Sequence, residues 1–599
     1  MMRPLSSQGA TRRTALLAVS VRRHWLMVLL LAAGLVLRIL VQVAYRPALF
    51  YIDSIKYLLG AYPGNDPPGY QVIVQPLLHI VNPAVVAAGQ HLLGLGMAIA
   101  LYLVLRRRGV PGWLSALAVA PVLLDGYQLQ MEQLIMPDTG FEALVVAGLV
   151  LLLWNPRPRP WMVVAAGLAL GASATFRQVG EILILPALLY ALIVIPGARR
   201  RLGQALLLCA AFAVPILLAS FKNYTSIGQF SLAPYAPSTI YGRVAEVADC
   251  GRLSLPGYER PLCPTASQKR LGPDGLDHDL QSPVKTYHPP PSMANHNVMT
   301  DFARQVVMQQ PGSVAAAIGG DALKLFALRR VTFPGDTPIS RWQFQPEYPQ
   351  HPPYITIRGG QVVFASRTPT GGGKVLGTGA QFGGGGPVVV KPLASFLRGY
   401  QLGGGYTPGP VLAFATLAGL AGSLSLLWRR VRRRGPVRQA ALGCLLTFTA
   451  GAAILLISDL FEFNWRYQLP AVITLPPAAG FAIAALLAAL RARRTAAEPA
   501  RPGPAEPAAP AEPAGPLPVG SQALADGLEP GHGRQDDHGE RDQDGQWQPA
   551  RAGLGRDAAG HGPHDDGGQH ADAARPRLDL ASGHEPGQDP GEGARQVGG

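Results

Sequence analysis

The stretch WLMVLLLAAGLVLRILVQV, residues 25–43, decides the fold class of this chain. As a helix it matches the hydrocarbon core of a bilayer, which about 20 apolar residues cross. Nine further apolar runs follow, and together they predict an α-helical polytopic membrane protein with ten spans. The later runs lie near residues 84–105, 112–128, 139–154, 161–176, 181–196, 204–220, 408–428, 438–458 and 469–490.

Composition agrees with a membrane protein and excludes two other classes. Charged residues make up 15% of the 599 positions, against about 25% in an average soluble protein, and apolar residues make up 48%. These values are inconsistent with an ordinary soluble enzyme and with a wholly disordered chain. The net charge of +15 does not indicate nucleic-acid binding, because the basic residues stand in short clusters between apolar runs.

The basic clusters determine the predicted topology. Short loops rich in Lys and Arg face the cytoplasm. If the N-terminus is cytoplasmic and the ten runs alternate in direction, every cluster falls on the cytoplasmic side. The first run is interpreted as a retained span, since no clean cleavage site follows it. The clusters lie at residues 106–108, 157–159, 199–201, 429–438 and 491–494.

The same alternation predicts the domain organisation. A short cytoplasmic N-terminus, residues 1–24, precedes a transmembrane catalytic region at 25–220, which contains spans one to seven. A large extracytoplasmic loop at 221–407 separates this region from spans eight to ten at 408–490. The segment at 495–599 is rich in Pro, Gly and charged residues, so we expect a disordered cytoplasmic tail.

The outer loops carry two further structural signals. The run at 70–81 has about 12 residues and is broken by Pro76, so it is more typical of an interfacial or re-entrant segment than of a span. Cys250 and Cys263 lie in the large loop, where the predicted compartment is oxidising. Glycines and prolines between these two cysteines help the chain turn back, and we expect a disulfide.

Acidic residues stand at the predicted outer membrane face. Asp53 lies about ten residues beyond the first span, in the stretch YIDSIKY at 51–57. A carboxylate held there can serve as a general base or a metal ligand, and the alternative is a solvated loop acid. Asp138 stands where an N-cap of the fourth span would lie, and Glu142 shares its helix face. An acid at the depth of Glu142 must be paired or face a wet cavity.

The last outer loop carries an arginine among aromatic residues. The stretch DLFEFNWRYQLP at 459–470 places Arg466 between a tryptophan and a tyrosine, at the depth of the lipid head groups. Its guanidinium could hold a phosphate through two hydrogen bonds. Alternatively, Arg466 could be a snorkelling interfacial arginine, whose charged end only contacts water and head groups. Arg177 and Glu181 fit an i,i+4 ion pair better than a second phosphate contact.

The order of these features resembles a known family of membrane enzymes. Asp53, the stretch PPGY at 67–70, Asp138 and the stretch RYQLP at 466–470 together resemble the GT-C glycosyltransferases. Within that superfamily, residues 25–490 are similar to the protein O-mannosyltransferase and lipid A aminoarabinose transferase branch. The resemblance implies transfer of a sugar from a polyprenyl-phosphate donor to an acceptor on the outer face, which is a protein, a lipid or a cell-wall glycan.

The resemblance also assigns roles to individual residues. Asp53 takes the place of the catalytic acid that deprotonates the acceptor or holds a metal, and Asp138 takes that of the second-loop acid. Glu132 is a nearby alternative to Asp138, and Arg466 would meet the lipid phosphate. Tyr70, at the end of the PPGY stretch, is expected to contact substrate.

Two departures from the family pattern affect these assignments. Many relatives have a basic residue directly before the Pro-Pro pair, where this chain has Asp66, so Lys56 is expected to substitute in binding the donor. Some relatives carry two adjacent acids in loop one, whereas Ser54 follows Asp53 here. A divalent metal, Mg²⁺ or Mn²⁺ held by Asp53 and Asp138, is therefore left as an open expectation.

Two rival functions fit a polytopic chain. A transporter or lipid flippase would place its acids near mid-membrane on broken helices, whereas the candidate acids here cluster at one face. A non-catalytic membrane scaffold is the other alternative. The one-sided cluster favours an enzyme whose partners are membrane lipids, a lipid-linked sugar and an unknown acceptor, with no nucleic acid.

Overall fold

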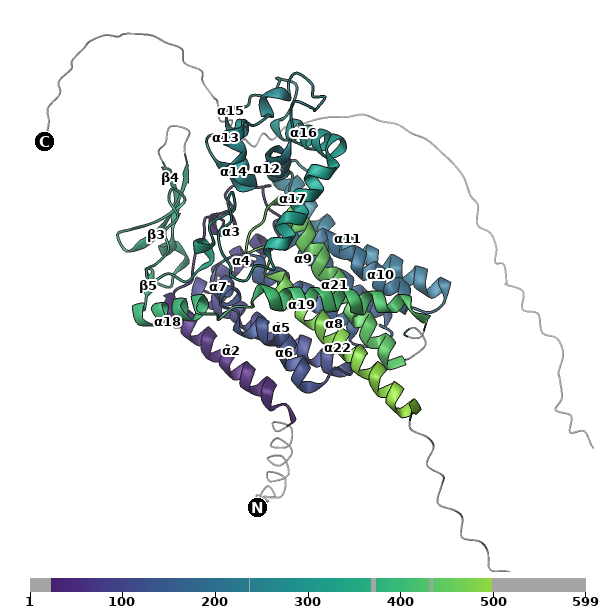
Figure 1. Ribbon diagram of the computed structural model, residues 1–599. Helices are drawn as coiled ribbons and strands as arrows, with labels where there is room; N and C mark the ends of the chain where they lie inside the picture. Colours follow the sequence, from purple (N-terminus) through teal and green to yellow (C-terminus); the bar gives the residue numbers. More distant parts are fainter. Residues whose placement is uncertain (1–22, 236, 368–372, 430, 432–434, 498–599) are drawn as a thin grey trace, which may run out of the picture. The chain divides into compact units, whose positions relative to one another are not determined.

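The computed structural model describes residues 23–235, 237–367, 373–429, 431 and 435–497. The predicted cytoplasmic N-terminus (1–24) and the predicted tail (495–599) lie almost entirely outside the described residues. Helices dominate the described chain, and its short strands lie in the large loop and at the end of the first span (Figure 1).

Each predicted span coincides with a helix. Six of these helices are long and apolar enough to cross a membrane, which confirms the multi-pass α-helical class. The other four helices are shorter, so the count of ten spans stays a prediction. The helices are α2 (Trp25–Ala44), α5 (Pro83–Arg107), α6 (Gly112–Leu124), α8 (Asp138–Leu153), α9 (Pro160–Phe176), α10 (Ile184–Val194), α11 (Ala198–Ile227), α19 (Gly409–Leu424), α21 (Gly435–Phe461) and α22 (Pro470–Ala497).

The helices differ in how deeply they are buried in the bundle. In their most apolar windows, 67% of α21 and 72% of α22 are buried, against 28% of α2 and 22% of α11. The outer helices expose leucines such as Leu29 and Leu218, as lipid-facing helices do. Close packing of two helices needs small residues at their contact. Gly171 of α9 is such a residue, because a side chain there would collide with the backbone of Phe212 in α11.

The region after the third span differs from the prediction. The helix α6 ends at Leu124 instead of 128, because Asp125 caps the short helix α7 (Gly126–Gln133). The Asp125 carboxylate also accepts a hydrogen bond of 2.8 Å from Arg330 of the large loop. The Arg330 guanidinium in turn lies 4.5 Å from the centre of the Tyr127 ring. This buried ion pair fastens the large loop to the helix bundle.

The first outer loop forms two short helices, α3 (Ser54–Leu59) and α4 (Gly69–Leu78). The predicted interfacial segment at 70–81 corresponds to α4, which follows the proline pair and contains Pro76. The chain between α3 and α4 therefore stays at one end of the bundle. Asp53 stands directly before α3, and Asp66 lies between α3 and α4.

The large loop contains a helical part and a small sheet. Residues Tyr241 and Phe302 lie in the centre of the helical part, with ring centroids 5.5 Å apart. The sheet is antiparallel with strand order β2-β3-β4. The elements are α12 (Pro237–Val247), η2 (Arg260–Leu262), α13 (Ala266–Lys269), α14 (Gly272–His278), α15 (Pro283–Thr286), α16 (Asn295–Gln309), α17 (Pro311–Lys324), η3 (Ile339–Trp342), β2 (Ile355–Arg358), β3 (Gln361–Arg367), β4 (Gly373–Thr378), η4 (Gly379–Phe382) and α18 (Lys391–Leu402).

The large loop folds back onto the end of the first span. The strand β1 (Tyr45–Arg46) pairs antiparallel with β5 (Val388–Val389). The hydroxyl of Tyr45 donates a hydrogen bond of 2.7 Å to the carbonyl of Gln345, and that of Tyr348 donates one of 2.6 Å to the carbonyl of Ala48. Segments about 300 residues apart are thus held together around the first loop.

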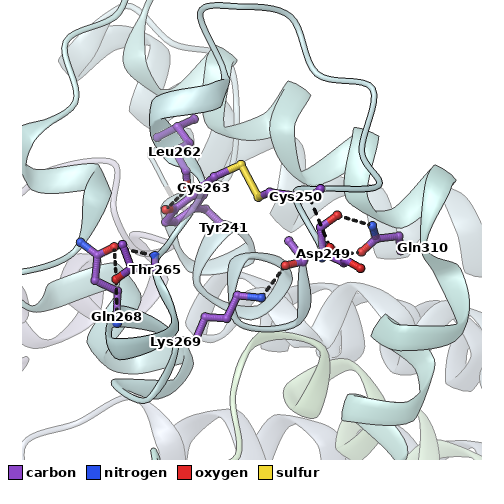
Figure 2. Close-up of a disulfide and its surroundings, with 11 residues drawn as sticks. Tyr241, Asp249, Cys250, Leu262, Cys263, Thr265, Gln268, Lys269 and Gln310 are labelled. Atoms are coloured by element: carbon purple, nitrogen blue, oxygen red, sulfur yellow. Dashed lines mark hydrogen bonds between the residues drawn. A yellow bond between two sulfur atoms is a disulfide. The ribbon is translucent and has the colours of Figure 1, made fainter.

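A disulfide joins Cys250 and Cys263 in the helical part of the large loop, with their Cα atoms 6.2 Å apart (Figure 2). On one side of the bridge, Asp249 and Gln310 exchange two hydrogen bonds of 2.8 Å. On the other side, the buried hydroxyl of Tyr241 donates to the carbonyl of Leu262 at 2.7 Å. The disulfide ties the segment after α12 to η2.

Thiol labelling tests this disulfide. The chain has four cysteines, and Cys209 and Cys444 are free. In denatured, unreduced protein, we expect a maleimide to label two thiols, and four after reduction. The Cys250→Ser variant should also lower the stability of the large loop, because closing such a loop contributes about 3 kcal/mol. Four labelled thiols before reduction would show that the disulfide is absent.

Candidate active site

Three segments far apart in sequence bring charged side chains to one place. The first loop contributes Asp53, Lys56 and Asp66, and the last loop contributes Arg466. The third contribution is Asp138 at the start of α8. The structure therefore brings together Asp53, Lys56, Asp138 and Arg466, which the sequence had marked as candidates.

Arg466 lies at the centre of this cluster and is 6% exposed. Its Nη1 donates a hydrogen bond of 2.9 Å to Oδ2 of Asp53, and its Nε lies 3.6 Å from Oδ1 of Asp138. Its Nη2 donates to the hydroxyl of Tyr467 at 3.1 Å. The turn before α22 holds the backbone in place, because Asn464 Oδ1 accepts from the Arg466 amide at 3.1 Å. Arg466 is thus a buried, paired residue.

Asp53 stands before α3 without capping it, because its side chain faces two cations instead. Lys56 Nζ lies 3.2 Å from its Oδ1 and 2.8 Å from Oδ2 of Asp66. Burial alone would raise the pKa of Asp53, but the charges of Lys56 and Arg466 outweigh burial and hold that pKa well below its usual range. The Asp53 carboxylate is therefore ionised and weakly basic in this arrangement.

Asp138 has a different role from the predicted N-cap. Pro137 occupies the cap position, and Asp138 is the first residue of α8. Its Oδ1 lies 2.5 Å from Nη1 of Arg177, whose guanidinium lies 4.3 Å from the centre of the Tyr467 ring. Glu142, one turn along α8, accepts a hydrogen bond of 2.7 Å from Gln128. Each acid thus has a polar partner at one of its two carboxylate oxygens.

The predicted ion pair between Arg177 and Glu181 is wrong. Arg177 ends α9 in an extended conformation, with φ −141° and ψ 125°, and the 3-10 helix η1 (Gln178–Leu183) begins after it. The two residues therefore do not share a helix face, and Arg177 pairs with Asp138. Glu181 is exposed.

A cavity opens beside this cluster. Its volume is ≈ 130 Å³, and Arg177, Arg466 and Tyr467 line one part of it, with Asp66 and Pro67 on another. A second cavity of ≈ 400 Å³ shares Asp66 and Pro67 with the first and extends between α4 and the end of α11. The side chains that line the second cavity include Lys56, His79, Lys222, Val72 and Pro76. The charged centre is therefore continuous with a space that has both basic and apolar walls.

Tyr70 supports the cavity wall. It is buried, and its hydroxyl donates a hydrogen bond of 2.8 Å to Oε1 of Gln90. Its ring packs edge-on against Tyr57 and Phe176, at 5.3 and 5.9 Å between centroids. Both of these aromatic residues line the first cavity. The geometry thus gives Tyr70 a positioning role, and its predicted substrate contact stays a prediction.

Glu132 belongs to a separate buried network. Its Oε1 lies 2.7 Å from Nη2 of Arg38 in α2, and its Oε2 lies 2.9 Å from Nδ1 of His91 in α5. The side chain of Glu132 is fully buried, so the network fixes the end of α7 rather than facing the cavity. Arg38, a lone charge in the first apolar run, was the signal in the sequence that a buried partner existed.

The large loop contributes residues that the sequence did not mark. Arg341 donates a hydrogen bond of 3.0 Å to the hydroxyl of Tyr51, two residues before Asp53. Trp342 lies under the Arg466 guanidinium, 5.2 Å from its ring centre. In the last loop, burial raises the pKa of Glu462 to about 8. No periodicity or motif distinguishes Arg341 or Trp342 in the sequence.

Asp53 and Asp138 do not fit a divalent cation. Each carboxylate already contacts a positive side chain, and both contact Arg466. Within the described part of the chain, no group of three or more His, Cys, Asp or Glu side chains is placed to hold a metal ion. A metal would have to displace the cations that now neutralise these acids.

One family model matches part of this chain. Residues 53–227 match the family model of dolichyl-phosphate-mannose-protein mannosyltransferases. Over these residues, the match bears out the resemblance to GT-C membrane glycosyltransferases. The matched range begins at Asp53 and contains Asp138 and Arg177, and it ends before Arg466. No curated protein matches the chain.

Two solved structures are similar to this chain at low identity. The Archaeoglobus fulgidus oligosaccharyltransferase, tethered with an acceptor peptide, has 12% identity and a TM-score of 0.34 over 80% of this chain and 51% of its own. ArnT from Cupriavidus metallidurans, bound to undecaprenyl phosphate, has 13% identity and a TM-score of 0.27 over 77% of each chain. The chain thus spans about half the length of the oligosaccharyltransferase.

The variant Glu132→Gln tests the structural role of the Arg38 network. Removing one partner of a buried ion pair costs about 3–5 kcal/mol, because it leaves Arg38 uncompensated. We expect the apparent melting temperature in detergent to fall by about 5 °C or more. Glu181→Gln, at an exposed acid, is the control and should melt like the wild type. A Glu132→Gln variant that also melts like the wild type would contradict the role.

Proposed function

We propose that this protein is a membrane glycosyltransferase that moves a sugar from a polyprenyl-phosphate donor to an acceptor hydroxyl at the outer membrane face. The single observation that carries the proposal is the position of Arg466. It bridges Asp53 and Asp138 on the wall of a cavity that continues between α4 and α11. The family match over residues 53–227 supports the same reaction class.

The donor would bind with its phosphate near the cations of the cluster. Arg177 and Arg466 line the first cavity, and Lys56 lines the second. A guanidinium can meet two phosphate oxygens at once, so these side chains suit a phosphodiester. The apolar side chains between α4 and α11, such as Val72 and Pro76, would contact the start of the isoprenoid chain.

Binding of the donor would also activate Asp53. In the present geometry Lys56 and Arg466 neutralise the Asp53 carboxylate, which makes it a weak base. A donor phosphate competes for the same two cations. As they turn to the phosphate, Asp53 loses its partners and its affinity for a proton rises. The donor would therefore bind before the acceptor is deprotonated.

The transfer step follows from these positions. Asp53 accepts the proton of the acceptor hydroxyl while the hydroxyl oxygen attacks the anomeric carbon. The bond from that carbon to the phosphate oxygen breaks, and its electron pair leaves with the polyprenyl phosphate. Arg466, Arg177 and Lys56 stabilise the charge that develops on the phosphate. A direct displacement of this kind inverts the anomeric centre.

The main rival is a transporter or flippase of lipid-linked sugars. Such a protein would hold its charged residues near the middle of its spans. Here Asp53, Asp138 and Arg466 lie at or beyond the ends of α2, α8 and α21, which supports an enzyme. The sugar, the acceptor and the outer location of the site belong to the proposal.

A transfer assay with Asp53→Asn tests this function. Membranes that contain the full chain are incubated with radiolabelled polyprenyl-phosphate sugars, and label in lipid-free product is measured. The wild type should transfer label, and Asp53→Asn should lose about 10²-fold or more of the rate, since the base is removed. Glu181→Gln is the matched control, because it also converts an acid to an amide.

Two results would contradict the proposal. If the Asp53→Asn variant transferred sugar at the wild-type rate, Asp53 would have no catalytic role. Movement of intact labelled donor across the bilayer of proteoliposomes, without transfer to any acceptor, would favour the flippase.

A further inference from the structure

A large cavity lies at the other end of the bundle from Arg466. It has a volume of ≈ 700 Å³, and described residues that follow α19, begin α21 and lie near the end of α22 line it. Its walls include the apolar side chains of Trp428, Leu486 and Leu490, and two arginines, Arg429 and Arg493, also line it. We propose that this cavity binds an anionic phospholipid of the surrounding bilayer.

The cavity lies one membrane thickness from the charged centre. The helix α22 begins at Pro470, four residues after Arg466, and Arg493 is close to its other end. The 24 residues from Pro470 to Arg493 rise about 35 Å, slightly more than the ≈30 Å hydrocarbon core. By the charge rule this end faces the cytoplasm, so the inference concerns the opposite leaflet and is independent of the proposed transfer reaction.

The walls of the cavity match the two halves of a phospholipid. Pockets for small ligands have volumes of about 300–1,000 Å³, so this one can hold a head group and the first part of the acyl chains. Leu486 is 59% exposed and Trp428 is 69% exposed, and both would contact lipid at this depth. The two arginines provide the positive charge that a lipid phosphate needs.

The two arginines that line the cavity belong to basic stretches of the sequence. Residues 429–438 contain six arginines, and residues 491–494 contain three more. Clusters of Lys and Arg next to the cytoplasmic end of a span attract anionic lipids at about 1 kcal/mol per residue. A free inorganic anion would use only the arginines and leave the apolar walls exposed. An anionic phospholipid uses both.

Native mass spectrometry of the purified full chain tests the inference. The protein is delipidated in detergent and titrated with phosphatidylglycerol, and separately with phosphatidylcholine. We expect phosphatidylglycerol to bind and to stay bound in the mass spectrometer, and we expect phosphatidylcholine to bind much more weakly. In the double variant Arg429→Gln/Arg493→Gln, affinity for phosphatidylglycerol should fall about fivefold for each arginine removed. The matched control is Arg157→Gln/Arg159→Gln, which removes two exposed arginines from another predicted cytoplasmic loop.

A second variant tests the apolar part of the cavity. Ala489→Trp places a large side chain where Ala489 now lines the space, so it should displace the lipid without changing the net charge. Melting temperatures of all variants show whether they fold. Three results would overturn the inference: equal affinity for the two lipids, equal loss in the Arg157→Gln/Arg159→Gln control, or displacement of phosphatidylglycerol by equimolar inorganic phosphate.

Discussion

The contact on which the site depends is that of one guanidinium with two carboxylates. Arg466 pairs with Asp53 and approaches Asp138, and these residues come from the last loop, the first loop and the start of α8. Three cations and three acids gather here, with Lys56, Asp66 and Arg177 completing the set. Charges taken out of water are stable only when they are paired in this way, so the cluster fixes how the three segments meet.

The rest of the fold keeps those segments in place. The ion pair of Asp125 and Arg330 fastens the large loop to the bundle, and β1 pairs with β5 beside the first loop. The network around Glu132 holds α7 against α2 and α5, just before Asp138. Because the pairs at the centre neutralise one another, only a competing anion is expected to open them. This links donor binding to the basicity of Asp53.

The sequence predicted the helices better than their contacts. Apolar runs located the helices because hydrophobic length is a local property, although the end of α6 was missed. Asp53, Asp138 and Arg466 could be chosen from their order and their predicted sidedness. The pairing of Arg177 with Asp138 could not, because it depends on the extended residue that ends α9. Arg341 and Trp342 were also hidden, since they reach the site only through the folding of the large loop.

The most direct test of the account is a donor titration with Arg466→Lys, at saturating acceptor. The guanidinium contacts Asp53, Asp138 and Tyr467 through three different nitrogens, and an ammonium cannot reproduce this fork. We expect Arg466→Lys to raise the apparent KM for the donor about tenfold and to lower kcat, and we expect Arg466→Ala to have a still higher KM and lower kcat. An Arg466→Lys variant with unchanged KM and kcat would contradict the account, because an arginine that only reaches for water can be replaced by lysine.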